Sequence, residues 1–244
     1  MSLSTEELIA QLLFELEKKV SPKKPVYYKK TTSPSEFRAL GIRTPAVRKI
    51  ANASFRMLKE QNITAIDEVL GYCDALLQER ISELRTIAVQ WSSKCKKQFQ
   101  PKHFKVFEQW LNESVTGWGS CDDLCVKSLG EFLFQYPEFI PRIKQNWTTS
   151  ENLWVRRASA VIFIYSLRRE KYLEHIFDIA DALFTDEEKY VLKGYGWMLK
   201  EASNKFQTAV YDYVKKRKAT MPRLSLRYAI EKMPEPMRKE LMSR

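Results

Sequence analysis

The sequence predicts an all-α protein, a solenoid of stacked helix pairs. Nearly every segment of the 244-residue chain places its apolar side chains at helical spacing, and none shows sustained strand alternation. Capping boxes mark helix starts at residues 4–7, 33–36 and 185–188. A proline at the first helical position marks a further start at residues 44–45. Prolines interrupt the pattern repeatedly, so we expect short helices joined by tight turns.

Short helices in series, with no Gly/Ser-rich linker between them, are typical of a repeat array. HEAT-like repeats take about 40–47 residues each, which leaves room for about five or six stacked helix pairs. We therefore predict a single HEAT-like domain over residues 1–244.

One spacing matches this repeat length. Trp118, Arg157 and Trp197 are separated by 39 and 40 residues. Equivalent positions of successive repeats line the same face of a solenoid, so these side chains are expected to converge on one concave surface. The alternative is a chance match to the period.

The chain is strongly basic, with 41 Lys and Arg residues against 30 Asp and Glu and a formal net charge of +11. Such an excess attracts polyanions, most commonly nucleic acid, although a basic surface kept only for solubility is the alternative. No apolar run approaches the ~18 residues of a membrane span, and the acidic start of the chain does not resemble a signal peptide. We expect no membrane partner and a cytoplasmic protein, associated with the nucleoid when bound to DNA.

The cysteine and histidine positions do not indicate a metal site. The four cysteines form no C-x-x-C pair, and His103 and His175 are far apart in the sequence. Zinc ligands usually come in such close pairs, so we expect no metal, and no motif indicates a cofactor. Cys121 and Cys125 share a helix face, which favours packing over redox chemistry.

Glycine is rare, and four of the seven glycines flank two tryptophans, in residues 117–119 and 194–197. Glycine inside a helix costs about 1 kcal/mol relative to alanine, so it usually has a local cause. Because both tryptophans share this pattern, we favour rings left open at a cleft. The alternative is packing glycines at helix crossings.

Asp122 lies four residues after Trp118, on the same face of a predicted helix and within an apolar stripe. Asp123 is expected to point away into solvent. A carboxylate in such a stripe is costly unless it is paired or faces a cleft. Arg157 has the same apolar surroundings. Two interpretations stay open: a buried Asp122–Arg157 ion pair that holds two repeats together, or an acid and a guanidinium set between two indoles in a cleft.

The second interpretation suits the cleavage of an N-glycosidic bond to a cationic base. A carboxylate can stabilise an oxocarbenium-like sugar, and indole faces attract cations. A guanidinium can grip a phosphate. A cationic base is already a good leaving group, so no general acid is required.

At these residues the sequence resembles the AlkD-type DNA alkylation repair glycosylases, a family of HEAT-like repeat proteins. The matching stretches are residues 40–45, 118–122, 152–158, 196–197 and 224–230. The resemblance implies a concave, basic solenoid that clasps duplex DNA. It also implies a monofunctional glycosylase that removes cationic N3- or N7-alkylated purines without a metal and without a lysine nucleophile. We expect it to act as a monomer.

The resemblance assigns roles to individual residues. It implies that Asp122 is the catalytic aspartate, which stabilises the sugar cation and helps to place water. It also implies that Trp118 and Trp197 pack against the lesion nucleotide and that Arg157 lies near the phosphate. Tyr28, or its neighbour Tyr27, would be the lesion-facing aromatic near the N-terminus. The residues in stretches that resemble DNA-backbone contacts are Arg43, Thr44, Arg48 and Arg227.

Two competing functions remain on the same scaffold. Some relatives keep the fold but have lost base excision and bind branched DNA, so the chain would then be a non-catalytic binder of duplex or branched DNA. A HEAT-type protein-interaction scaffold is the other, and it would bind DNA weakly with little salt dependence. The presence of Asp122, Trp118 and Arg157 together favours the enzyme.

Overall fold

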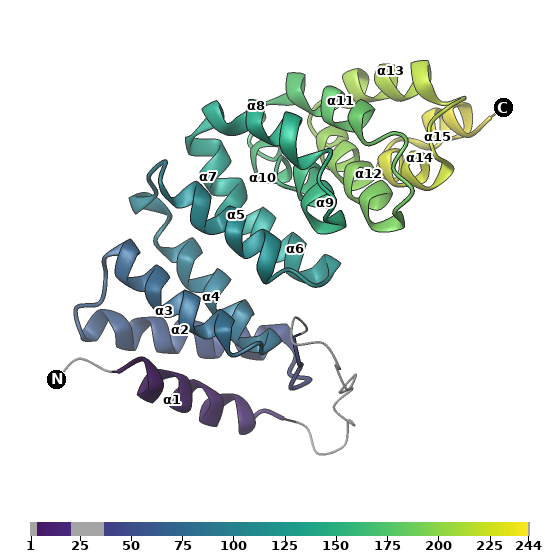
Figure 1. The fold of residues 1–244 in the computed structure, drawn as a ribbon. Helices are drawn as coiled ribbons and strands as arrows, with labels where there is room; N and C mark the ends of the chain where they lie inside the picture. Colours follow the sequence, from purple (N-terminus) through teal and green to yellow (C-terminus); the bar gives the residue numbers. More distant parts are fainter. Residues whose placement is uncertain (1–3, 21–36, 244) are drawn as a thin grey trace. The chain divides into compact units, whose positions relative to one another are not determined.

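The computed structural model, drawn in Figure 1, describes residues 4–20 and 37–243. These residues divide into two compact units between Thr116 and Gly117. All regular elements in these residues are helices, and the only β pairing there is an isolated bridge between Arg38 and Ile81. The predicted all-α class is therefore confirmed, and the run of short helices is consistent with a helical repeat. The continuous solenoid, its concave basic surface and the single domain stay predictions.

The first unit contains five α-helices and one 3-10 turn in its described residues. They are α1 (Thr5–Glu17), α2 (Thr44–Glu60), α3 (Ile66–Gln78), α4 (Ser82–Lys94), η1 (Lys96–Gln98) and α5 (His103–Glu113).

The second unit is built of shorter helical segments. They are α6 (Trp118–Leu124), η2 (Cys125–Leu129), α7 (Gly130–Gln135), η3 (Pro137–Phe139), α8 (Ile140–Arg142), η4 (Ile143–Trp147), α9 (Leu153–Val161), α10 (Ile164–Leu167), α11 (Leu173–Ala182), α12 (Lys189–Ser203), α13 (Gln207–Arg217), α14 (Arg223–Ala229) and α15 (Glu235–Met242).

Two of the predicted helix starts are confirmed. Ser4 and Glu7 form the reciprocal capping box of α1, and α2 begins at Thr44 with a proline in its first turn. The predicted box at residues 185–188 is wrong, because α12 begins at Lys189 and the Glu188 N–H donates to the carboxylate of Asp186. The box at residues 33–36 lies outside the described residues.

In the first unit, α4 packs against both α2 and α3, and α1 packs against α2. Trp91 of α4 is fully buried, and its indole N–H donates to the Ala51 carbonyl of α2 at 2.9 Å. The buried carboxylate of Glu83 accepts the backbone N–H of Leu40 and of Ile42, at 3.0 and 3.2 Å. These bonds hold the segment that leads into α2.

In the second unit, α12 is the central helix. It packs against α9, which precedes it in the sequence, and against α14, which follows it. It has eight buried residues among its 15, and the phenol of Tyr195 is fully buried. Residues 118–135 run as one helix, interrupted by the π-helical turn η2 directly after α6. No helix in the described ranges is both long and apolar enough to traverse a bilayer.

The contact of α12 with α14 predicts a measurable stability effect. A Cβ on Gly196 would lie 2.7 Å from the Tyr228 Cβ and 3.0 Å from the Ser225 carbonyl oxygen. Gly196→Ala should therefore force the two helices apart and lower the free energy of unfolding by about 1–3 kcal/mol. Thermal denaturation followed by circular dichroism measures this change. Gly119→Ala is the control, since a Cβ there meets no atom within 4 Å; an equal loss in both variants would contradict the close-packing explanation.

Candidate functional site

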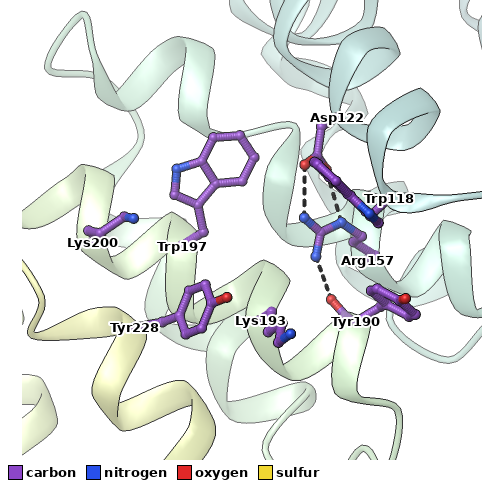
Figure 2. Close-up of a pocket in the computed structure, with 8 residues that line it drawn as sticks. All are labelled: Trp118, Asp122, Arg157, Tyr190, Lys193, Trp197, Lys200 and Tyr228. Carbon is purple, nitrogen blue, oxygen red and sulfur yellow. Dashed lines mark hydrogen bonds and ion pairs between the residues drawn. The ribbon is translucent and has the colours of Figure 1, made fainter. Parts of the chain in front are cut away.

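A cavity of about 510 Å³ opens in the second unit, and it is lined from four helices (Figure 2). Both tryptophans, the acid and the arginine singled out in the sequence lie on its wall. The lining residues are Trp118 and Asp122 of α6, Arg157 of α9, Tyr190, Lys193, Trp197 and Lys200 of α12, and Tyr228 of α14.

Asp122 and Arg157 form a two-point ion pair in the wall of this cavity. The Arg157 Nε donates to Asp122 Oδ1 and Nη2 donates to Oδ2, each at 2.9 Å. A third N–H, on Nη1, donates to the Tyr190 carbonyl at 2.5 Å. The Arg157 side chain is 6% exposed and that of Asp122 is 16% exposed. The pair links α6 to α9 and also faces the cavity. The ion-pair interpretation and the cleft interpretation are therefore compatible with each other.

The surroundings shift the pKa of both partners. Burial raises the pKa of Asp122 above its ordinary value, although the hydrogen bonds from Arg157 oppose that rise. Burial acts to lower the pKa of Arg157, but the Asp122 carboxylate outweighs it and raises that pKa. The guanidinium consequently stays charged, and Asp122 is the member of the pair that can titrate.

The two indoles are held differently. Trp118 stands in the first turn of α6 and is 58% exposed. The indole N–H of Trp197 donates to the Glu201 carboxylate at 2.9 Å, and Arg168 donates to the same carboxylate at 2.9 Å. Trp197 is thus oriented by a hydrogen bond before any ligand binds, whereas Trp118 projects into solvent.

The glycines beside the two tryptophans have two different structural explanations. A Cβ on Gly117 or Gly119 would meet no atom within 4 Å, so the space around Trp118 is open. A Cβ on Gly194 would instead lie 3.1 Å from the Arg157 Cγ, and Gly196 packs against α14. The packing explanation applies to the α12 glycines, and Gly194 leaves room for the Arg157 side chain to pass between α9 and α12.

Four lining residues were not predicted from the sequence: Tyr190, Lys193, Lys200 and Tyr228. Lys193 and Lys200 lie four residues before and three after Trp197, so the helical period placed them on its face. Lys200 pairs with Glu231 at 3.1 Å, and its ammonium lies 5.8 Å from the centre of the Tyr228 ring. The Tyr190 ring lies 5.2 Å from that of Trp154.

The other predicted site residues lie elsewhere. Arg43, Thr44 and Arg48 are exposed at the start of α2 in the first unit, and Arg227 is exposed on α14. Their assignment to the DNA backbone stays a prediction. Tyr27 and Tyr28 lie outside the described residues.

The prediction for Asp123 was wrong, because this carboxylate does not point freely into solvent. It pairs with Lys127 at 2.9 Å, and its side chain is 16% exposed. The i,i+4 spacing of the two residues in a continuous helix explains the pair. In the described part of the chain, no group of three or more His, Cys, Asp or Glu side chains is placed to hold a metal ion. The four thiols are free and buried.

The buried ion pair predicts a large effect of removing one partner. Asp122→Asn leaves the Arg157 charge uncompensated in a site where it is 6% exposed, and should lower the free energy of unfolding by roughly 2–5 kcal/mol. Urea denaturation measures the loss. Glu235→Gln is the control, since its pair with Lys239 is 66% and 78% exposed and should contribute less than about 0.5 kcal/mol. Equal losses in the two variants would show that the Asp122 pair is not buried.

Comparison with known proteins identifies the family. The family model for DNA alkylation repair enzymes matches residues 12–233. A solved structure from Enterococcus faecalis, named a predicted DNA alkylation repair enzyme, superposes with a TM-score of 0.70 over 96% of this chain and 100% of that chain. The two share 17% sequence identity, so this similarity shows the fold. Among curated proteins, none matches the sequence. Because the family model covers most of the chain, this protein belongs to the DNA alkylation repair enzyme family.

Proposed function

We propose that the protein is a monofunctional DNA glycosylase that hydrolyses the N-glycosidic bond of cationic N3- or N7-alkylated purines in duplex DNA. Membership of the DNA alkylation repair enzyme family supports a role in DNA repair. The observation that carries the finer proposal is the Asp122 carboxylate, oriented by Arg157 in an open cavity whose wall includes Trp118 and Trp197.

The carboxylate of Asp122 suits a reaction in which positive charge develops on the sugar. As the bond to a cationic base breaks, the base leaves neutral and the charge moves to the sugar, where an adjacent anion stabilises it. An ionised carboxylate accepts about four hydrogen bonds, and Arg157 supplies two. The remaining lone pairs are available to the sugar and to the attacking water. Arg157 therefore acts by orienting Asp122.

The aromatic wall suits the cationic base. Trp118, Tyr190, Trp197 and Tyr228 all line the cavity. A ring face attracts a cation by about 0.5–2 kcal/mol, depending on how far the pair is removed from water. An alkylated purine carries this charge and an unmodified purine does not, so the cavity would favour the damaged base. We further propose that Arg43, Thr44, Arg48 and Arg227 contact phosphates of the duplex.

Excision of 7-methylguanine from a duplex tests the proposal. Wild-type protein should release the base, and heating should then cleave the strand at the abasic site. Asp122→Asn should lower the single-turnover rate about 100-fold or more, because the anion opposite the sugar cation is lost. Asp123→Asn is the matched control: it removes the neighbouring carboxylate, which does not line the cavity, and should retain excision.

The same assay separates the competing functions. Binding to duplex or branched DNA without any excision by the folded wild type would support a non-catalytic binder. Weak binding with little dependence on salt would support a protein-interaction scaffold. Loss of excision in both carboxylate variants would remove the special role of Asp122.

The pH dependence of excision follows from the state of Asp122. Burial raises its pKa, and only the ionised form stabilises a sugar cation, so the rate should fall as the pH drops through this raised pKa. Arg157→Gln removes the hydrogen bonds that lower the pKa and should move the acidic limb to higher pH. Single-turnover rates on a 7-methylguanine duplex between pH 5 and 8 measure this shift. A limb that stays in place in Arg157→Gln would contradict the assignment to Asp122.

A further inference from the structure

We propose that Lys193 binds the backbone phosphate next to the damaged nucleotide. Three cationic side chains line the cavity, Arg157, Lys193 and Lys200. They differ in whether their charge is already matched. This inference rests on the proposed function, since it names the residue that holds the substrate's phosphate.

Two of the three cations have partners. Arg157 uses three of its N–H groups on Asp122 and the Tyr190 carbonyl, and its side chain is 6% exposed. The Lys200 ammonium is paired with Glu231 at 3.1 Å. Two N–H groups of Arg157 remain, but its charge is already matched by the Asp122 carboxylate, as that of Lys200 is by Glu231.

Lys193 is the exception. Among the residues that the structure describes, its ammonium has no hydrogen-bond or ion-pair partner, although the side chain is partly buried in the cavity wall. It lies one helical turn before Trp197, on the same face of α12, and between Tyr190 and Tyr228 in the view of Figure 2. Since the Asp122 and Lys200 pairs are each neutral, the cavity carries one unmatched positive charge.

That positive charge attracts a phosphate and repels the cationic parts of the substrate. A cationic base and a cationic sugar are both repelled by a nearby ammonium. A phosphate bound to Lys193 cancels the repulsion and brings the negative charge of the strand close to the sugar. The cavity is therefore matched to a nucleotide within a DNA strand, with its phosphate at Lys193, rather than to a free base or nucleoside.

A coupling experiment tests this contact. Duplexes carrying a tetrahydrofuran abasic analogue are made with natural flanking linkages, or with one neutral methylphosphonate on the 5′ or the 3′ side. Wild-type protein should bind about tenfold more weakly when one of these two linkages is neutral, as expected for a lost charge-assisted contact. Lys193→Gln should show that tenfold loss on the natural duplex, and no further loss when the same linkage is neutral.

Matched variants make the outcome specific. Lys189→Gln removes an exposed lysine from the same helix, one that does not line the cavity, and should keep the full sensitivity to the neutral linkage. Lys193→Arg keeps the charge and should keep that sensitivity as well, so it provides a second test if the glutamine variant folds poorly. The circular dichroism spectrum of each variant checks its fold.

The proposal is overturned if wild-type binding is insensitive to both linkages, or if Lys193→Gln is as sensitive as the wild type. Because binding to the abasic analogue requires no excision, failure of the glycosylase proposal is seen separately in the 7-methylguanine assay. If binding by Lys193→Gln stays sensitive to the neutral linkage and binding by Arg157→Lys does not, Arg157 is the residue that contacts the phosphate.

Discussion

The ion pair between Asp122 and Arg157 joins α6 to α9, and the third hydrogen bond of the guanidinium joins both to α12 through the Tyr190 carbonyl. Helices α6 and α9 carry few turns each, so their relative positions depend on such contacts. The pair also holds the Asp122 carboxylate in one orientation in the cavity wall, where the proposed reaction needs it. The packing of these helices and the proposed chemistry therefore depend on the same three hydrogen bonds.

This double role explains the glycines of α12. A buried guanidinium needs space for its side chain, and the missing Cβ of Gly194 provides it beside the Arg157 Cγ. The missing Cβ of Gly196 brings α14 close enough to place Tyr228 on the cavity wall. Each glycine costs helix propensity, and the close approach of a neighbouring helix offsets that cost. The central helix of the second unit is thus also the one that shapes the cavity.

The three cationic side chains of the cavity differ in whether a carboxylate already matches their charge. Arg157 is committed to Asp122, and Lys200 is committed to Glu231. Lys193 has no such partner in the described chain, and we propose that a phosphate of the substrate matches its charge. In the site that we propose, the phosphate, the sugar and the base would each meet a group of suitable charge: an ammonium, a carboxylate and aromatic rings.

The sequence by itself determined the helical class and the starts of α1 and α2. Its repeat spacing also predicted that Trp118, Arg157 and Trp197 share one surface, with chance as the alternative, and the cavity wall contains all three. Helical periodicity and capping are local, and they need no knowledge of distant residues. Only the tertiary structure decided that Asp122 and Arg157 are bonded at two points, that the α12 glycines pack against neighbouring helices, and that Lys193 lacks a partner within the described chain. Those facts depend on how different helices pack together, and no local pattern contains the distances between them.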